Sequence, residues 1–470
     1  MEIIIVGAGI AGLSAGIALR RAGHIVTILE QSALLQETGA AISIAPNASP
    51  VLRSWGFDPA KSRMVAIKTG CILNGSSMQM MVPNYYANIE EKYGLPIYSV
   101  HRVDLHEQLK ALATGEDGPG LPCKLHIETT PMLSAGFDHV CQDAVNAKVT
   151  LADGTVWQAD LIIAANGVHS TAREHVLDTD ETNASNTGWA TMRWLLPTDE
   201  LLADANTAPL VEYSTQRYFM GAQGGGLVWY QCRKYVPDSP LLRCLRKLLI
   251  FLGSSNEVQN FLYLSQSFAS SNITEDFQAG IDPAMVMDYA KKEFSPALQA
   301  VLAKAREVKF WKLVARDPIS SWRKDSLLLI GDAAHPMLPF QAQGGGQAIE
   351  DAAALGILLN QVQDKAIMKE RLALFEQVRK SRGSAIQLLS NSGPPVPQCI
   401  RDAAAKYLPK GTSLQNQDDV IDLIFSYDVI GQTKAILAKS VSGKEGMSNE
   451  IQNGMENGVR NGMQNGVTVM

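Results

Sequence analysis

The sequence predicts an α/β protein in which a doubly wound, Rossmann-like domain is interleaved with a second, mostly antiparallel-sheet domain and followed by a helical C-terminal cap. Three observations predict this arrangement. A short apolar run at the N-terminus leads into a glycine-rich turn, two further fully apolar runs recur far along the chain, and the segment between those two alternates apolar and polar residues. Continuous apolar runs are typical of buried parallel strands, whereas alternation is typical of an antiparallel sheet with one solvated face.

The N-terminal segment predicts one complete βαβ unit. Residues 3–6 predict a buried strand, residues 13–22 follow helical spacing, and residues 25–29 predict a second strand that is followed by Glu30. A unit of about 30 residues has the length expected of a parallel crossover. We therefore expect these two strands to be parallel neighbours in the main sheet.

Later segments extend both sheets. Residues 161–165 and 327–330 are fully apolar and run directly into glycine-containing turns, as buried parallel strands do. Between them, residues 180–310 change in texture, and the run from Gly226 to Arg233 alternates like a strand with one solvated face. This interval predicts the second, antiparallel domain.

The C-terminal part of the chain predicts helices and then a tail. Residues 351–361 and 368–389 predict long helices, and residues 402–438 predict the helical cap. In residues 441–470, Asn-Gly pairs recur every four residues with few apolar residues between them. Such a repeat cannot build a core, so we expect a disordered tail.

Composition limits the classes of function. The chain has 470 residues, with 41 lysines and arginines against 47 acidic residues, a net charge of −6 and no basic run, which argues against a nucleic-acid partner. No apolar run reaches the ~18–20 residues that a transmembrane segment requires, and the N-terminus lacks the charged start of a signal peptide. Six scattered cysteines without a CxxC pair predict a reducing, cytoplasmic location. Eight histidines without an HExxH pattern indicate no metal site.

A dinucleotide-binding motif follows the first strand. Gly7 permits a tight turn, Gly9 lets a pyrophosphate approach the backbone, and Gly12 lets the helix pack close to the strand. Glu30 ends the second strand, where a carboxylate can accept hydrogen bonds from the adenosine ribose. This acid disfavours a 2′-phosphate, and the motif by itself leaves FAD and NAD open.

A second motif decides between the two cofactors. The strand at 327–330 runs into GDAAHP at 331–336, followed by PFQAQGGGQA at 339–348 and the acids Glu350 and Asp351. These segments resemble those of the group A FAD-dependent monooxygenases, with salicylate hydroxylase-like aromatic hydroxylases and fungal secondary-metabolite monooxygenases as the nearest forms. The resemblance implies FAD as the cofactor.

The resemblance also implies how this region meets the flavin. Asp332 would contact the ribityl hydroxyls, and the turn at Gly344, Gly345 and Gly346 would begin a helix aimed at the pyrimidine edge of the flavin. A helix N-terminus favours the negative charge that reduced flavin carries there. We expect Glu350 and Asp351 in the first turn of this helix, where its dipole stabilises acids.

Three further matches to the family add cofactor residues. The stretch 160–170 resembles the family's motif for FAD and the transient nicotinamide cofactor, with Asn166 where the family usually has Asp, which puts nicotinamide docking in doubt. Gly39 and Ala41 match the loop beside the flavin ring. Arg102 matches an arginine that reaches the FAD phosphates or ribityl chain, although an arginine taken alone is more often a surface residue.

The resemblance implies a reaction. NADPH or NADH would reduce FAD as a transient co-substrate, and O2 would then form a C4a-hydroperoxyflavin. One oxygen atom would hydroxylate or epoxidise a small aromatic or polyketide-derived secondary metabolite, and the other would leave as water. The cofactor carries this chemistry, while the protein supplies position and a dry, apolar pocket.

Candidates for substrate contact lie in the second domain. Arg193 and Tyr230 could project from the sheet, because related enzymes use an arginine and a tyrosine in comparable places to hold a phenolate. The alternative is that Arg193 pairs with a surface acid and Tyr230 only packs. His335 is interpreted as a turn residue rather than a base, and Trp311 and Trp322 as packing or pocket-lining residues.

Other functions remain open at this level. An FAD-dependent reductase or halogenase would share the fold, although the WxWxIP signature of halogenases is absent. Asn166 and a basic, leucine-rich insertion at 234–256 raise a third alternative, a flavin-binding protein without turnover. The insertion itself could be an amphipathic helix or a gene-model artefact.

The patterns and the resemblance together give domain limits. We expect a discontinuous FAD-binding domain at 1–75, 100–178 and 311–395, a substrate-binding β-sheet domain at 179–310, and C-terminal helices at 396–440 before the tail.

Overall fold

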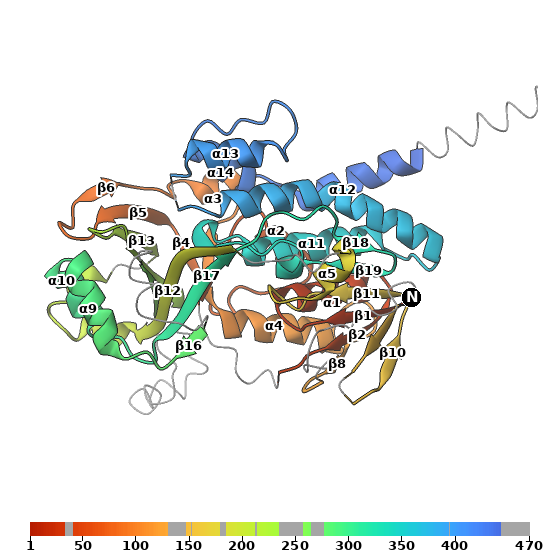
Figure 1. The fold of residues 1–470 in the computed structure, drawn as a ribbon, viewed down its shortest axis with the longest axis horizontal. Coiled ribbons are helices and arrows are strands. Elements are labelled where there is room, and N and C mark those ends of the chain that lie inside the picture. The colour runs from red at the N-terminus through yellow and green to blue at the C-terminus, as the bar shows by residue number, and fades with distance from the viewer. Residues whose placement is uncertain are drawn as a thin grey trace, which may run out of the picture.

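Two large sheets and the helices around them organise the molecule (Figure 1). The structure is a computed structural model that describes residues 1–32, 41–129, 147–151, 153–178, 185–211, 214–234, 257–264, 277–393 and 395–442. Most of the expected insertion at 234–256 and nearly all of the expected tail at 441–470 lie outside these residues.

The first sheet is the predicted Rossmann-like one. Its strands, in spatial order, are β18 (Arg323–Lys324), β19 (Leu327–Leu329), β11 (Leu161–Ala164), β1 (Glu2–Val6), β2 (Ile25–Leu29) and β8 (Lys124–His126). All neighbours are parallel except β18 and β19. The central strand β1 is buried from Ile3 to Val6 because it has a strand on each side and helices over its face. The four strands predicted from apolar runs are thus confirmed.

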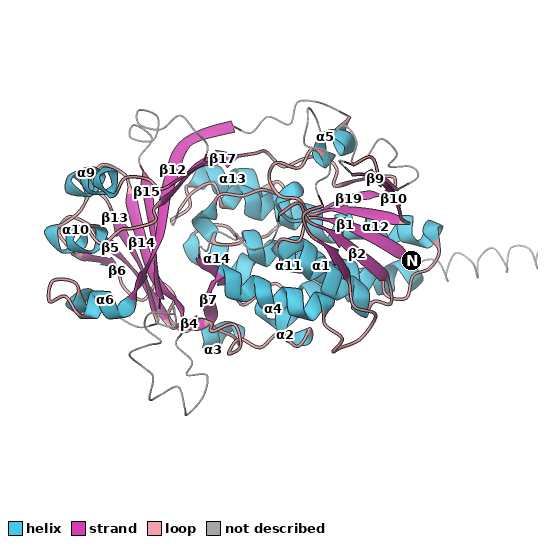
Figure 2. Ribbon diagram, turned by 90° about the horizontal axis from the view of Figure 1, so that it is seen from below, coloured by secondary structure: helices cyan, strands magenta, loops and turns pink. Residues whose placement is uncertain are grey.

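Four long helices build the rest of this half (Figure 2). They are α1 (Ile10–Arg21), α4 (Arg102–Thr114), α11 (Gly344–Leu358) and α12 (Lys365–Leu389). Helix α1 lies against α4 and α11, and α11 in turn contacts α12. A Cβ atom on Gly356 of α11 would come within 2.9 Å of Ala18 of α1, so glycine permits this close approach. Both predicted C-terminal helices are present, and each begins earlier than expected.

The second sheet is mostly antiparallel, as predicted. Its order is β16 (Phe277–Ala279), β17 (Lys309–Ala315), β12 (Ser185–Pro197), β15 (Glu257–Leu264), β14 (Gly226–Arg233), β13 (Thr215–Met220), β5 (Thr69–Asn74) and β6 (Met80–Val82). Only β13 and β5 pair in parallel. Strands β5 and β6 precede residues 179–310 and β17 extends past residue 310, so the sheet draws chain from both sides of that interval. The domain limits themselves stay a prediction.

One face of the second sheet packs on two helices. Helices α9 (Pro283–Glu293) and α10 (Pro296–Leu302) cover Trp194, Phe219 and Trp229 in one buried cluster. Because side chains alternate along a strand, the residues between these face the opposite side, towards the first half of the molecule. Strand alternation therefore decides which side chains can reach a ligand between the two halves.

Short elements connect the halves. Strands β3 (Ala41–Ile44), β7 (Ile97–His101) and β4 (Val65–Ile67) form a small antiparallel sheet, and β9 (Lys148–Thr150) pairs with β10 (Val156–Gln158). The short helices are α2 (Ser49–Ser54), α3 (Ile89–Tyr93), α5 (Ala172–Leu177), α6 (Thr198–Leu202), η1 (Ala208–Leu210), η4 (Gly331–Ala333) and η5 (Pro339–Gln341).

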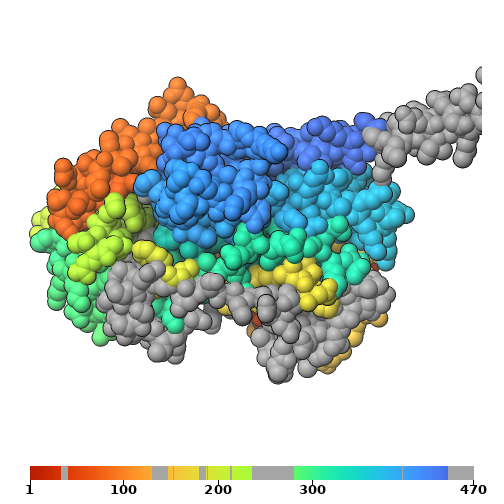
Figure 3. All heavy atoms as spheres, turned by 45° about the horizontal axis from the view of Figure 1, so that its top comes forward, coloured from red at the N-terminus to blue at the C-terminus, as the bar shows by residue number. Residues whose placement is uncertain are grey.

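The predicted helical cap is confirmed. Helices α13 (Gln398–Ala405) and α14 (Gln417–Phe425) are followed by a helical segment at 429–442. In Figure 3 this part of the chain, in blue, lies between the orange segment that includes β5 and β6 and the lighter blue segment that includes α12. Among the described residues, no helix is both long and apolar enough to cross a membrane.

Candidate functional site

A cavity of about 360 Å³ opens between the two halves of the molecule. Gly9, Arg102, Asp332 and Gly344 line its Rossmann-like end. Its other end is lined by side chains of the second sheet and of the loops beside it. Residues that the sequence assigned to cofactor binding and residues that it assigned to substrate contact therefore share one cavity.

The glycines of the first turn differ in what a side chain at each position would meet. Gly7 has a φ of +105°, and a Cβ atom there would lie 2.5 Å from the Ala165 carbonyl oxygen at the end of β11. A Cβ atom on Gly12 would lie 1.9 Å from the Gly7 oxygen, so α1 can start this close only with glycine. A Cβ atom on Gly9 would meet nothing within 4 Å, which leaves the backbone open to a ligand.

Helix α1 presents its N-terminus to this open space. Gly9 is the N-cap, no side chain caps the helix, and no acid occupies its first turn. The first N–H groups of a helix have no partner within the helix, and the dipole adds positive potential to them. This end of α1 is therefore a ready anion site of the kind that a pyrophosphate fills.

Glu30 lies at the end of β2, where the sequence placed it. Its carboxylate accepts hydrogen bonds from the backbone N–H of Ala8 at 2.7 Å and of Ser32 at 2.9 Å. The two bonds fix its position beside the glycine turn. Each carboxylate oxygen keeps a further lone pair, so Glu30 can still accept from ribose hydroxyls.

Hydrogen bonds from Arg173 fix the backbone of the turn that carries Asp332. Arg173, which is buried, donates to the Ala333 carbonyl oxygen at 2.9 and 3.2 Å and to the Asp332 carbonyl oxygen at 3.1 Å. Burial, with Arg316 nearby, lowers the pKa of Arg173 to about 10. Desolvation by the protein around it raises the pKa of the Asp332 carboxyl, against the opposite influence of His335, Arg102 and Arg173. The backbone of this turn is thus fixed, and the Asp332 side chain is exposed to the cavity.

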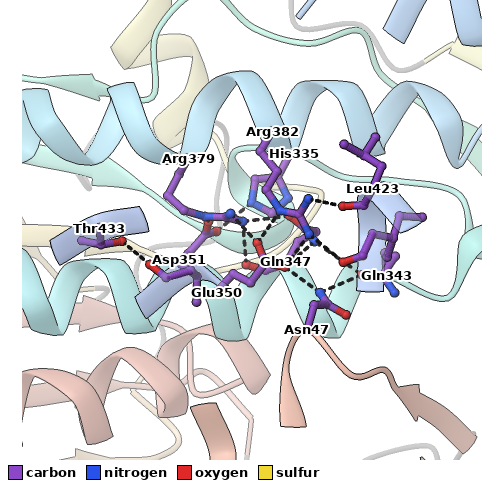
Figure 4. Close-up of polar contacts among 12 residues, drawn as sticks. Asn47, His335, Gln343, Gln347, Glu350, Asp351, Arg379, Arg382, Leu423 and Thr433 are labelled. Atoms are coloured by element: carbon purple, nitrogen blue, oxygen red, sulfur yellow. Dashed lines mark hydrogen bonds and ion pairs between the residues drawn. The ribbon is translucent and has the colours of Figure 1, made fainter. Parts of the chain in front are cut away.

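The expectation that Glu350 and Asp351 lie in the first turn of the next helix is wrong. Helix α11 begins at Gly344, so both acids fall in its second turn, where they are fully buried. Glu350 pairs with Arg379 and Arg382 of α12, and Asp351 pairs with Arg379 at 2.9 Å (Figure 4). The two arginines neutralise the two acids, so the helix end itself carries no competing negative charge.

His335 follows η4, is buried and has a hydrogen-bond partner. Its Nε2 lies 2.7 Å from Asp351 Oδ2, and its ring centroid lies 4.8 Å from that of Trp322. Trp322 is buried and packs against Gly383. The sequence could not identify this partner. His335 and Asp351 are separated by η5 and the first turns of α11, so only the folded chain brings them together.

Asn166 adds an unsatisfied acceptor beside the cofactor end. It follows β11, and its Oδ1 is buried with no hydrogen-bond partner among the residues that the structure describes. Its neighbours Ala165 and Gly167 line the cavity, as do Ala41 and Gly345. Gly346 is buried one position further along α11, and Gly39 lies outside the described residues.

The residues present fit a bound FAD. The open backbone at Gly9, the uncapped N-terminus of α1, the carboxylate of Glu30 and the unsatisfied oxygen of Asn166 are the groups that a dinucleotide would engage. No group of metal-ligating side chains that could hold an ion occurs in the described ranges.

Arg193 and Tyr230 both face the cavity from the second sheet. Arg193 on β12 pairs with Phe261 of β15, which pairs with Val228 of β14, so Arg193 is level with Val228, two residues before Tyr230. The Arg193 guanidinium lies 4.9 Å from the centroid of the Trp311 ring, a cation–π contact that orients it. The structure thus brings the two predicted residues into one wall, two strands apart.

Sequence reasoning missed most of this wall. Tyr85, Tyr86, Tyr218 and Phe340 also line the cavity, and the Tyr85 and Tyr86 rings lie 4.7 Å apart. Burial raises the pKa of Tyr86 to about 12 and raises those of Tyr85 and Tyr218 as well. Their hydroxyls are therefore neutral donors at pH 7. One signal for this wall was present in the sequence, the adjacent pair Tyr85 and Tyr86 in the loop between β6 and α3.

Comparisons with known proteins agree with this geometry. A family model described as FAD binding domain matches residues 1–388. The chain is 54% identical, over 87% of its length and 96% of the relative's, to FAD-dependent monooxygenase phomE′ of Diaporthe leptostromiformis. It is similar in fold to CtdE solved with FAD and a substrate (TM-score 0.71, 21% identity) and to a salicylate hydroxylase substrate complex (TM-score 0.66, 19% identity), covering 93% of this chain and 98% of each structure.

These findings confirm the resemblance drawn from the sequence motifs. The matched family covers both the glycine turn and the segment around Asp332, and the 54% identical relative spans nearly its whole length. The cofactor is FAD, and the substrate is a small molecule. The chain belongs to the FAD-dependent monooxygenases.

Proposed function

We propose that the protein hydroxylates or epoxidises a small aromatic or polyketide-derived compound, using O2 and either NADPH or NADH. The observation that carries this proposal is the shared cavity, in which the cofactor turns face an aromatic wall that contains Arg193 and Tyr230. The bound flavin, once reduced, would supply the activated oxygen atom.

The cofactor end of the cavity holds FAD through backbone and side-chain groups. The N-terminus of α1 would bind the pyrophosphate and Glu30 the adenosine ribose, while Arg102 and Asp332 would contact the phosphates or the ribityl chain. Gly344, Gly345 and Gly346 would place the positive end of α11 where the flavin gains negative charge on reduction.

The sheet end orients the substrate and keeps water out. The Arg193 cation, held against Trp311, would favour the ionised form of a phenol or enol and so make its carbon more nucleophilic. Tyr230 would donate a hydrogen bond to the same substrate. Phe340 and Val228 add apolar surface that excludes water from the reacting oxygen.

Asn166 would contact both FAD and the transient nicotinamide cofactor. An amide keeps an acceptor oxygen, adds a donor and removes the charge that a carboxylate would have there. Its unsatisfied Oδ1 fits a hydrogen bond from a transiently docked NADPH or NADH. We also propose a cytoplasmic location, since the six cysteines are scattered along the sequence without a CxxC pair.

The test is a coupled turnover measurement. The purified protein should contain FAD, and a panel of phenols and enolic polyketides should stimulate NADPH or NADH oxidation with equal O2 uptake and a product heavier by one oxygen atom. Product formation without O2 uptake would instead indicate a reductase. FAD content without stimulation by any compound in the panel would favour a flavin-binding protein without turnover.

Substitution at the wall tests the residue roles. Arg193→Met should keep the FAD content while reducing product per NAD(P)H oxidised, because an unheld substrate lets activated oxygen escape as hydrogen peroxide. Arg217→Met is a matched control, since Arg217 lies on strand β13 of the same sheet and its guanidinium donates to the Leu210 carbonyl. Equal effects of the two substitutions would remove Arg193 from the substrate site.

A further inference from the structure

A ladder of side-chain amides connects the buried ion pairs to the cavity (Figure 4). Asn47 Nδ2 donates to Glu350 Oε1 at 2.6 Å and to Gln343 Oε1 at 3.1 Å. Gln347 Nε2 donates to the same two oxygens, at 3.1 and 3.4 Å. All four side chains are buried. The ladder lies at the N-terminus of α11, where Gln343 is the N-cap residue.

Glu350 fixes the direction of every amide in this ladder. Burial opposes its ionisation, but Arg382 and Arg379 outweigh burial and hold the pKa of Glu350 below its ordinary value. An ionised carboxylate only accepts hydrogen bonds, so Asn47 and Gln347 must turn their NH2 groups towards it. Arg379 Nη2 donates to Gln347 Oε1 at 2.8 Å, which selects the same orientation independently.

The orientation passes on to Gln343. Because Asn47 and Gln347 both present NH2 groups to it, Gln343 must face them with its oxygen, and its nitrogen occupies the opposite end of the amide. Gln343 lines the cavity, and its Nε2 has no hydrogen-bond partner among the residues that the structure describes. A donor at the wall of the cavity without a protein partner can bind an acceptor of a ligand there.

We propose that Gln343 Nε2 donates a hydrogen bond to the pyrimidine edge of the bound flavin, with Asn47 as a positioning residue that fixes the amide. This inference rests on the proposed placement of FAD along α11. Gln343 directly precedes Gly344, whose N–H belongs to the positive helix end, so the side chain adds one more donor at the same place. A donor fixed before the reaction needs no reorganisation when charge develops.

The consequence is a selective stabilisation of reduced flavin. Negative charge on the pyrimidine edge strengthens a hydrogen bond from a fixed donor, so reduced flavin gains more from Gln343 than oxidised flavin does. Gln343→Met keeps the length of the side chain and removes the donor. We expect it to lower the preference for reduced over oxidised flavin about tenfold, which for a two-electron couple is about 30 mV. Gln343→Glu should lower it further, because it places a carboxylate there.

The experiment is a redox titration of the FAD-loaded enzyme, followed by its visible spectrum, together with the dissociation constant of oxidised FAD. Gln341→Met is the matched control, since Gln341 lines the same cavity but its Nε2 donates to the Ser392 carbonyl at 3.0 Å. The control should leave the potential unchanged. Asn47→Ser keeps Gln343 but removes the shorter of the two hydrogen bonds to its oxygen, so it should give a smaller drop in the same direction.

The outcomes separate this inference from the proposed function. An unchanged potential in FAD-loaded Gln343→Met, or an equal drop in Gln341→Met, would overturn the role of Gln343 even if turnover is normal. Failure of the wild-type protein to bind FAD would instead contradict the placement of the cofactor. If the Gln343 variants do not fold, Asn47→Ser decides, and an unchanged potential in that variant overturns the proposal.

Discussion

The two ends of the cavity are built in different ways. At the cofactor end, the groups come from short contiguous turns, at 7–12, 331–333 and 344–346, each placed where a parallel strand ends or a helix begins. At the sheet end, single side chains from separate strands and loops converge, Arg193 and Tyr230 among them. A site built from backbone groups can be recognised in the sequence by glycines at fixed spacing. A site built from side chains of separate strands can be recognised only by the alternation of apolar and polar residues along each strand.

The strongest test of the backbone-built end is a pair of glycine substitutions. Gly12→Ala places a methyl group where only 1.9 Å separates it from the Gly7 oxygen, so we expect loss of FAD and of most of the folded protein. Gly9→Ala meets no protein atom within 4 Å, so it should fold normally but bind FAD at least tenfold more weakly. Flavin absorbance and thermal melting of both variants measure the contrast, and normal FAD binding by Gly12→Ala would contradict it.

The next largest effect concerns the ion pairs below the cavity. Glu350→Ala removes the buried carboxylate that pairs with Arg382 and leaves Arg379 with Asp351 alone, which should cost about 3–5 kcal/mol in the free energy of unfolding. Asp204→Ala breaks a half-exposed pair with Lys304 and should cost less than about 1 kcal/mol. Urea unfolding of the two variants gives both values, and equal losses would show that burial does not set the cost.

The same acids predict the direction of the pH dependence. At Asp351, His335 and Arg379 outweigh the effect of burial, and at Glu350 the arginines Arg379 and Arg382 do the same. The pKa of each acid therefore lies below its ordinary value. A lowered pKa gives stability that is present above the unfolded-state pKa, about 4, and lost as the pH falls through the folded-state value. Unfolding at pH 3 to 7 should show this loss, and Glu350→Gln should flatten it. A wild-type protein equally stable at pH 3 would refute the assignment.

The comparison explains how far the sequence could be read. The parallel strands, the glycine turn and Glu30 were predictable because local chain geometry demands those residues at those positions. The pairing of Asp351 with His335 and with Arg379 was not, because it depends on how α11 and α12 pack. The expectation that the acids serve the helix dipole failed for the same reason, since the pattern of a single helix carries no information about the partner across it.

The wall of the cavity shows the same limit. Arg193 and Tyr230 were singled out by resemblance, whereas Tyr86 and Tyr218 were not. Tyr86 comes from the loop after β6, and Tyr218 from a strand that pairs in parallel with β5, about 145 residues away in the chain. Only the folded sheet brings them together. The assigned roles of Arg193 and Tyr230 stay predictions.

We expect a moderate effect on catalysis from a substitution at the sheet end of the cavity. Tyr86→Phe removes a hydroxyl whose pKa burial raises to about 12, while the ring keeps its contact with Gly70. If that hydroxyl donates to the substrate, kcat/KM should fall about tenfold, which is about 1.4 kcal/mol, with FAD binding unchanged. Tyr407→Phe, on the exposed surface of the cap, is the control. Loss of FAD from Tyr86→Phe would mean that the two ends are not separable.

The smallest effect tests the point where the two ends meet. Ala342 lines the cavity and has a φ of 52°, a left-handed conformation that costs a residue with a Cβ atom about 1 kcal/mol. Ala342→Gly relieves this strain but adds about 0.5 kcal/mol of backbone entropy to the unfolded chain, so stability should rise by about 0.5 kcal/mol. Ala303→Gly, at a φ of −63°, should lower it by a similar amount. Because Ala342 directly precedes Gln343, a gain in stability accompanied by weaker FAD binding would show that the strained turn holds the amide ladder in place, whereas a gain in both would show that the strain serves neither end.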